Sequence, residues 1–424
     1  MPSATLDALR RQPGGERLLA VADERVHLVG GAVRDLLLVG GQRLPASVAP
    51  PRELDVVVEG EMEGLLAALG GEAVVHDRFG TASVSVDGAR IDLARARRER
   101  YPQPGALPEV EPAPLAEDLR RRDFTVNAIA LALAGEREGE TTAVEHAHED
   151  LAAGRLRVLH DRSFLDDPTR LWRLARYQAR LGFEIEERTG RLAREALSQN
   201  VLNTVSRARI GTELRLALGE ADPVAALTSL QELGVLAALH PRLSFDARLA
   251  RSALELLFCA TEAPELRPDL LVLSVLFQPM AVDVDEEGVE HEMHTLLDAM
   301  EFAAPERDRV LRAAICVAAI ADDLAHAETG SEIHEVASFE SLEAIALAGA
   351  WDEMTSGDAG VSAYRWLVEL RKVGLRIGGE DLLAAGIPEG PEIGRRLEAA
   401  LRAKLDDELE DGREAELAAA LRAG

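Results

Sequence analysis

The sequence HLVGGAVRD, residues 27–35, followed by ELDVVV, residues 53–58, decides the fold. The first segment is an apolar run that ends at Gly30-Gly31 and continues into a helix-forming stretch. Glycines carry no Cβ, so an anion can approach the backbone, and the helix that follows adds its positive N-terminal end. Arg34 would add a charged fork. We interpret this segment as a phosphate-binding turn.

The second segment places two carboxylates on a strand. Side chains alternate along a strand, so Glu53 and Asp55 project from one face while Leu54 and Val56 enter the core. Two carboxylates at this spacing can hold Mg²⁺ next to the phosphates of a nucleoside triphosphate on the glycine turn. Asp92, on an expected neighbouring strand, is the candidate third catalytic carboxylate. The alternative for Asp92 is a structural ion pair with nearby arginines.

The order of three motifs resembles that of one enzyme family. GGAVRD at 30–35, ELD at 53–55 and RRDFT at 121–125 follow one another along the chain. This order is similar to that of the class II tRNA nucleotidyltransferase and bacterial poly(A) polymerase family. The resemblance implies an α+β nucleotidyltransferase head of the DNA polymerase β-like type, a mixed sheet with helices, followed by an all-α neck, body and tail.

The resemblance and the local patterns together divide the chain into three parts. We expect a catalytic head at 1–145, a helical neck with a base-selecting helix at 146–220, and a helical, RNA-binding body and tail at 221–424. Within the head, period-two patterns and turn signals predict local structure. The expected strands are 26–29, 73–76, 82–86 and 90–93, and the expected helices are 32–38 and 62–69.

The segment before and around RRDFT carries further expectations. Residues 94–119 combine arginines with proline and glycine, which predicts a mobile loop over the site. The resemblance makes Arg121 and Arg122 ligands of the triphosphate or of RNA, and Asp123 and Asn127 partners of the ribose or of the turn. We expect an apolar helix to open here with Ala128, Ile129 and Leu131. As a plain helix start, Asp123 would be an N-cap.

The neck segment supplies the expected base-reading residues. Residues 166–176, DDPTRLWRLAR, resemble the neck helix of the family, with Asp167 and Arg170 at its E-D-x-x-R positions and Asp166 where Glu is usual. A carboxylate beside a guanidinium accepts cytosine and adenine and rejects uracil and guanine, by the pattern of donors and acceptors on each base edge. Three positions apart on the expected helix, the two side chains would share one face, and the alternative is an intrahelical ion pair. Arg173 joins the expected nucleotide-binding set, and Arg207 and Arg209 are the expected RNA-binding residues.

The amount and distribution of charge bear on whether the chain binds nucleic acid. A net charge of −28 and a pI near 4.8 argue against nucleic acid, because Lys and Arg supply most of the affinity for phosphate backbones. However, 30 of the 47 basic residues lie before residue 216, in clusters at 90–100, 120–122 and 155–194. We interpret these clusters as a local basic track. The alternative for any one of them is a solvated helix face.

Several features exclude other classes. No run of 18 apolar residues and no signal peptide is visible, which predicts a cytoplasmic protein without a membrane partner. Cys259 and Cys316 lie in apolar helical runs, where we expect buried thiols, and no zinc spacing occurs. The Pro-rich segment 40–51 is longer than the resemblance predicts, and we expect it to be packed or to contact a partner.

The sequence therefore predicts a template-independent nucleotidyltransferase that uses Mg²⁺, ATP and CTP to add CCA to the 3′ end of tRNA. No obligate protein partner is implied. An A-adding or CC-adding enzyme, or a poly(A) polymerase, would use the same head and neck. A catalytically impaired RNA-binding protein is the alternative of another class, because the family normally has Asp where this chain has Glu53.

Overall fold

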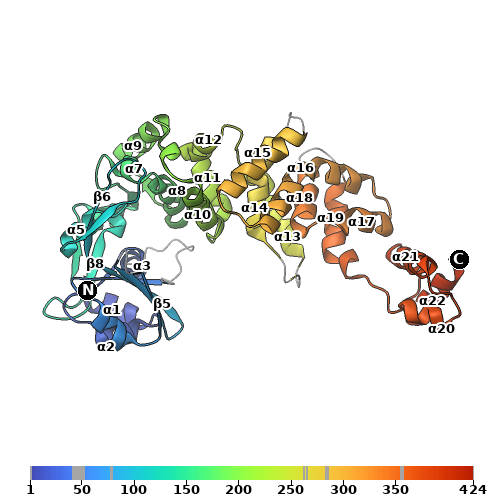
Figure 1. The fold of residues 1–424 in the computed structure, drawn as a ribbon, viewed down its shortest axis with the longest axis horizontal. Coiled ribbons are helices and arrows are strands. Elements are labelled where there is room, and N and C mark those ends of the chain that lie inside the picture. Colours follow the sequence, from blue (N-terminus) through green and yellow to red (C-terminus); the bar gives the residue numbers. More distant parts are fainter. Residues whose placement is uncertain are drawn as a thin grey trace. The chain divides into compact units, whose positions relative to one another are not determined.

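A seven-stranded sheet forms the centre of the N-terminal part, with the strand order β3-β4-β5-β2-β1-β8-β9. Two of its strands, β5 and β8, are labelled in Figure 1. Its strands are β1 Val26–Val29, β2 Glu53–Val58, β3 Glu72–His76, β4 Thr81–Val86, β5 Ala89–Arg95, β8 Ile129–Ala132 and β9 Thr141–Ala143. β2 pairs in parallel with β5, and the other neighbours pair antiparallel. The predicted mixed sheet is confirmed.

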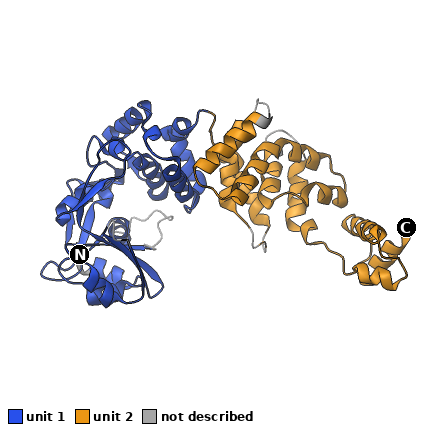
Figure 2. Cartoon of the chain, in the orientation of Figure 1, with its two compact units in different colours: residues 1–241 blue, residues 242–424 orange. Residues whose placement is uncertain are grey.

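The structure is a computed structural model that describes residues 2–40, 53–76, 80–260, 263, 266–281, 286–353 and 358–423. The expectation for the Pro-rich segment therefore lies, from residue 41 to 51, outside the described residues. The chain divides into two compact units, residues 1–241 and residues 242–424 (Figure 2). The expected head and neck both fall in the first unit, and the predicted boundaries at 145 and 220 stay predictions.

The two central strands show why the site forms where it does. β1 is buried along its whole length, as its sequence VHLV predicts. β2 alternates at its start, so Leu54 and Val56 are each 1% exposed while Glu53 and Asp55 remain accessible on the opposite face. Because β2 lies in the middle of the sheet, these carboxylates are held by hydrogen-bonded strands on both sides.

Residues 94–119 are ordered, and the prediction of a mobile loop is wrong. β6 Arg97–Arg100 pairs antiparallel with β7 Glu109–Pro112, and helix α5 Leu115–Arg120 follows. Arg98 lies opposite Glu111, with nitrogen and oxygen 2.7 Å apart. Charged residues lie opposite one another across this ribbon, so the apolar alternation that reveals most strands is missing.

The apolar residues after Asn127 form a strand, so the predicted helix is wrong. A 3-10 turn, η2 Thr125–Asn127, leads into β8, whose four residues are buried between β1 and β9. Short apolar runs have the same pattern in a buried helix and a buried strand. Phe124, and not Asp123, occupies the N-cap position of the turn.

Helices cover the sheet and continue beyond it. In the first unit they are α1 Pro2–Arg10, α2 Gly15–Val21, α3 Gly31–Gly40, α4 Glu63–Leu69, α6 Ala147–Ala153, α7 Ser163–Asp166, α8 Thr169–Leu181, α9 Glu187–Ser198, α10 Arg207–Leu218, α11 Pro223–Leu233 and α12 Val235–Leu239. Two short parallel strands, β10 Arg155–Leu156 and β11 Glu184–Ile185, and a 3-10 turn, η3 Val201–Thr204, interrupt them. α8 packs against α10 and α11. The predicted helical character of this part is therefore confirmed, and its division into a separate neck stays a prediction.

The second unit is helical in its described residues. Its helices are α13 Ala247–Cys259, α14 Pro268–Phe277, α15 Glu286–Ala299, α16 Ala304–His326, α17 Gly330–Ala337, α18 Leu342–Glu353, α19 Ala359–Val368, α20 Gly379–Ala384, α21 Pro391–Leu405 and α22 Arg413–Arg422, with 3-10 turns η4 Gln278–Ala281 and η5 Leu370–Lys372. The alanine-rich α18 packs against α13, α16 and α19. Cys259 and Cys316 are half-buried, so the expectation of buried thiols is wrong. Among the described helices, none has the length and apolar character needed to cross a membrane.

Candidate active site

The glycine turn lies at the junction of β1 and α3. Gly30 has a φ of +70°, and a Cβ there would lie 3.0 Å from Arg122 Nη1 and 3.4 Å from Asp55 Oδ2. A side chain at this position would therefore fill the space between the guanidinium and the carboxylate. The Gly30 amide donates to Ile129 O at 3.3 Å. The amides available to an anion are consequently those that follow, in the first turn of α3.

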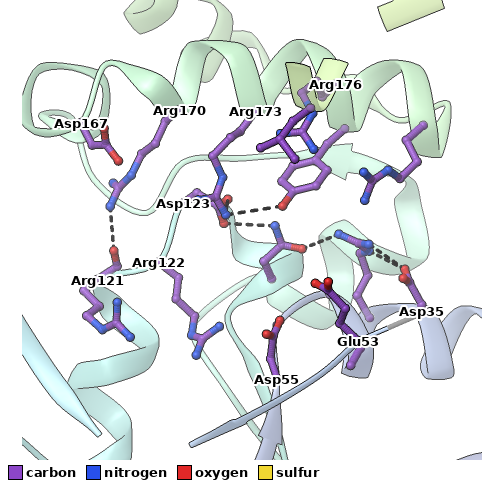
Figure 3. A pocket seen from close by; sticks show the side chains of 18 of the residues that line it. Asp35, Glu53, Asp55, Arg121, Arg122, Asp123, Asp167, Arg170, Arg173 and Arg176 are labelled. Carbon is purple, nitrogen blue, oxygen red and sulfur yellow. Dashed lines mark hydrogen bonds and ion pairs between the residues drawn. The ribbon is translucent and has the colours of Figure 1, made fainter. Parts of the chain in front are cut away.

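The carboxylates of β2 lie across from this turn (Figure 3). Although Asp55 is accessible from the pocket, desolvation by the surrounding protein raises the pKa of its carboxyl. Arg122 opposes this shift, and the negative charges of Asp92 and Glu53 add to it. Asp92 lies on β5, directly opposite Asp55 of β2. Its carboxylate accepts a hydrogen bond from Ser83 Oγ and another, at 2.9 Å, from Arg90 Nε. This geometry matches the alternative of a structural ion pair, and a catalytic role for Asp92 stays a prediction.

One pocket of about 1030 Å³ collects most of the predicted site residues. The predicted residues that line it are Gly30, Gly31, Arg34, Glu53, Asp55, Arg121, Arg122, Asp123, Asn127, Asp167, Arg170, Arg173 and Arg209. Asp92 and Arg207 are not among the lining residues. Nine arginines and seven carboxylates line the pocket, so positive charge prevails there within an acidic chain. That excess favours an anionic ligand.

A chain of hydrogen bonds and an ion pair joins α3 to α8 along the wall of the pocket. Arg34 is 1% exposed and donates to Asp35 Oδ1 at 2.8 Å and to Asn127 Oδ1 at 2.7 Å. Asn127 donates to Asp123 Oδ1 at 3.1 Å, and Arg173 Nη2 lies 2.6 Å from Asp123 Oδ2 (Figure 3). The Arg34 guanidinium therefore bonds to protein side chains, and it lies next to Gly31 in the glycine turn.

Asp123 is a buried carboxylate whose charge is balanced. Burial favours its neutral form, but Arg173, Asn127 and Arg170 outweigh burial and lower the pKa of Asp123. Its negative charge in turn raises the pKa of Arg173. The pair is consequently ionised at neutral pH and fixes Arg173 at the wall of the pocket.

Asp167 and Arg170 both line the pocket, but the predicted shared helical face is wrong. Asp167 lies before α8 in an extended conformation, and its Oδ1 accepts from Thr169 Oγ1 at 2.8 Å and from Arg209 Nη2 at 2.9 Å. Arg170, 4% exposed, donates to Ser163 Oγ and to Arg121 O, each at 2.7 Å. The alternative of an exposed intrahelical ion pair between Asp167 and Arg170 is thus not what the described contacts show.

Sequence reasoning missed one face of α8. Tyr177 lies in the pocket with the guanidinium carbons of Arg34, Arg180 and Arg173 at 5.3, 5.7 and 6.0 Å from its ring centroid. Arg176 and Arg180 both donate to Glu220. The positions 173, 176, 177 and 180 follow helical spacing, so the signal was present in the sequence. The buried Glu99 and Asp118 carried no comparable signal.

The carboxylates suit a divalent cation only in part. Across the described residues, no group of three or more Asp, Glu, His or Cys side chains has an arrangement suited to a metal ion. Mg²⁺ nevertheless commonly uses one or two carboxylates and takes its other ligands from water and substrate phosphates. Glu53 and Asp55 fit that donor set. Desolvation is the main cause of the raised pKa of Asp55, and the charges of Asp92 and Glu53, which add to it, are ones that a cation would offset.

Two protein-family models match parts of this chain. The family model for the poly A polymerase head domain matches residues 26–157, and that for the probable RNA and SrmB-binding site of polymerase A matches residues 182–246. The multifunctional CCA protein of Thioalkalivibrio sulfidiphilus is 30% identical over 332 residues, which covers 76% of this chain and 69% of that protein. This chain belongs to the class II tRNA nucleotidyltransferase and poly(A) polymerase family.

Members of this nucleotidyltransferase family with different specificities are similar to the chain. An A-adding tRNA nucleotidyltransferase of Geobacter sulfurreducens is 34% identical over 409 residues, 90% of this chain and 43% of that protein. A CC-adding tRNA nucleotidyltransferase of Deinococcus radiodurans is 41% identical over 236 residues, 54% of this chain and 58% of that protein. The chain thus spans about half the length of these curated relatives.

A solved structure of the family extends the likeness to the fold. The Thermotoga maritima CCA-adding enzyme complexed with tRNA has a TM-score of 0.73 and 28% identity, covering 97% of this chain and 98% of that one. The predicted α+β head with a helical remainder is confirmed by this match. The roles of individual site residues are not tested by such a likeness and stay predictions.

Glu53 stands where the family resemblance leads us to expect aspartate, and we predict a measurable consequence. One extra methylene moves the carboxylate by about 1 Å. A displacement of this size can lower the rate of a reaction that depends on precise positioning by about 10²-fold. If the rest of the site is built for aspartate, Glu53→Asp will be faster than the parent in single-turnover nucleotide addition. Equal rates for the two proteins would show that the site has adapted to glutamate.

Proposed function

We propose that this protein adds CMP and AMP, from CTP and ATP, to the 3′ ends of tRNA without a nucleic-acid template. One observation carries the proposal: the β2 carboxylates, the glycine turn and Asp167 face a single, positively charged pocket. A nucleoside triphosphate could place its phosphates at the turn and its base toward α8. Relatives that carry out A addition, CC addition and complete CCA addition support the same reaction class.

Each group in the pocket has a proposed role. Glu53 and Asp55 would hold Mg²⁺, which when bound would neutralise charge on the triphosphate and favour the deprotonated 3′ hydroxyl of the RNA. The first turn of α3, with Arg121 and Arg122, would bind the phosphates. Asp123 would face the ribose.

Base choice rests in this proposal on Asp167 and a guanidinium beside it. The carboxylate would accept from the exocyclic amine of cytosine or adenine, and the guanidinium would donate to the adjacent ring nitrogen. We assign the donor role to Arg170. Arg209, which touches Asp167 at 2.9 Å, would have to move aside or share this role.

Extension assays separate this function from its siblings. tRNA transcripts that end before CCA, after one C and after CC are incubated with CTP and ATP, singly and together. A CCA-adding enzyme extends all three to completion, whereas an A-adding enzyme extends only the last and a CC-adding enzyme stops before A. A poly(A) polymerase would extend RNA beyond one A. Retention of tRNA without any extension would identify the RNA-binding alternative.

The RNA partner predicts a steep salt dependence despite the acidic composition. About six phosphate contacts would give a log–log slope of affinity against salt of about −4 to −5, at roughly −0.7 to −0.9 per contact. Filter binding of tRNA between low and moderate salt measures the slope. Arg207→Gln should make it shallower, and Arg10→Gln on α1, an exposed residue outside the basic clusters, serves as the matched control. A slope near zero for the parent would exclude backbone recognition.

A further inference from the structure

Asp118 is a fully buried carboxylate outside the pocket, in the first turn of the short helix α5. It has 0% exposure, and it is not among the lining residues. Its two oxygens serve different arginines. Oδ1 accepts from Arg121 Nε at 2.9 Å and Nη2 at 2.8 Å, and Oδ2 accepts from Arg122 Nη2 at 3.1 Å. One carboxylate therefore holds both arginines that line the phosphate end of the pocket.

The two arginines are oriented toward the pocket by these contacts. Arg121 is fixed on its other side, where Nη1 donates to Glu99 Oε1 at 2.7 Å. Arg122 Nη1 points to the glycine turn, since it lies 3.0 Å from where a Cβ of Gly30 would be. The Nε of Arg122 is buried and has no hydrogen-bond partner. The position of Arg122 therefore depends on Asp118 more than on the other described contacts.

Arg122 also acts on the β2 carboxylates. It is the group that most opposes the raised pKa of Asp55. A shift of its guanidinium would change both the phosphate site and the charge beside Asp55. Asp118 also accepts from the Arg97 backbone amide at 3.3 Å, which ties it to the start of β6.

We propose that Asp118 is a positioning residue that orients Arg121 and Arg122 for binding the triphosphate of the incoming nucleotide. The proposal rests on the proposed function, because it assigns the two arginines to the phosphates. A carboxylate with no proton can accept from both guanidiniums at once. An amide of the same shape presents a donor to one of them, so that arginine must turn away.

Asp118→Asn is the test. The KM for ATP and for CTP should rise by about tenfold and by the same factor, since both nucleotides share the phosphate contacts. Rejection of UTP and GTP should not change, because the base-reading residues are elsewhere. Glu111→Gln is the matched control. It removes the exposed ion pair with Arg98 on the neighbouring β6–β7 ribbon and should leave the KM unchanged.

A double-mutant cycle distinguishes positioning from a general structural role. In an Arg121→Ala/Arg122→Ala background, Asp118→Asn should lose most of its effect on KM, because both residues through which it acts are gone. A full, additive effect in that background would overturn the proposal. So would an unchanged KM in the folded single variant. If Asp118→Asn does not fold, Asp118→Glu moves the charge by about 1 Å and should raise the KM, and an unchanged KM there would also overturn it.

Equilibrium dialysis with ATP separates this inference from the function on which it rests. If the parent extends no RNA, the proposed function fails, yet weaker ATP binding by Asp118→Asn would still support the positioning role. If the parent extends tRNA and the variant binds ATP as the parent does, only the positioning role fails.

Discussion

Asp55→Ala is expected to lower the rate of nucleotide addition by at least about 10³-fold while tRNA affinity stays within a few fold. The variant removes one of two proposed metal ligands and no proposed phosphate contact. Charge stabilisation by a bound metal supplies several kcal/mol, and 1.36 kcal/mol corresponds to a factor of ten. Single-turnover extension and filter binding measure the two quantities. Glu63→Ala, an exposed carboxylate on α4, is the control. Turnover that survives in Asp55→Ala would remove the metal assignment.

The same carboxylate should reduce stability at neutral pH. Its pKa in the folded protein is raised above the value of 3.8 expected when unfolded, so folding favours the protonated form. That contribution is present at low pH and is lost as the pH rises through the folded pKa. Asp55→Asn should therefore raise the Tm at pH 7 without divalent cations, and the gain should shrink at acidic pH. A lower Tm at pH 7 would contradict the pKa direction.

Asp167→Ala should yield a folded protein that has lost its preference for CTP and ATP. The carboxylate would no longer select an exocyclic amine, so discrimination against UTP and GTP should fall by about 10- to 100-fold, as a lost bidentate base contact does. Asp167 is partly accessible, and its loss leaves Arg209 bonded to Gly105 O at 3.0 Å. Folding should therefore survive. Competition assays with four nucleotides measure the discrimination.

Asp161→Ala provides the control for this variant. Asp161 lies six residues upstream and pairs with Arg188 at the surface, outside the pocket. It should keep the selectivity of the parent. If Asp167→Ala stays folded and rejects UTP and GTP as the parent does, base choice lies elsewhere. Arg170→Ala is a weaker test, because it would leave Ser163 Oγ and Arg121 O without their buried donor.

Local motifs predicted the components of the candidate site because their geometry is local. The open backbone at Gly30 follows from residue type, and the alternation at Glu53 and Asp55 follows from the strand period. The mixed sheet also followed, because its strands carry apolar alternation. The order of the motifs then indicated that distant segments meet, which spacing within one segment could not show.

The sequence did not show which charged side chains pair with one another in the folded protein. Arg34 is surrounded by Asp35, Asn127 and Tyr177, although its motif reads as a phosphate ligand. Asp92 lies opposite Asp55 but bonds to a neighbouring serine and arginine. Such pairings are set by tertiary distances of a few ångströms. The ribbon at 97–112 was missed for a related reason, since charged cross-strand pairs look like a loop.

A series of side-chain contacts limits where chimaeric enzymes of this family should be joined. It runs from Asp35 through Arg34, Asn127 and Asp123 to Arg173. A junction near residue 145 would take the two ends of that chain from different parents, and every link would have to be compatible. A junction after Pro241 would transfer residues 1–241 as one inherited block. Exchanges of specificity between A-adding and CC-adding parents should therefore be cut there, with the buried polar pairs kept from a single parent.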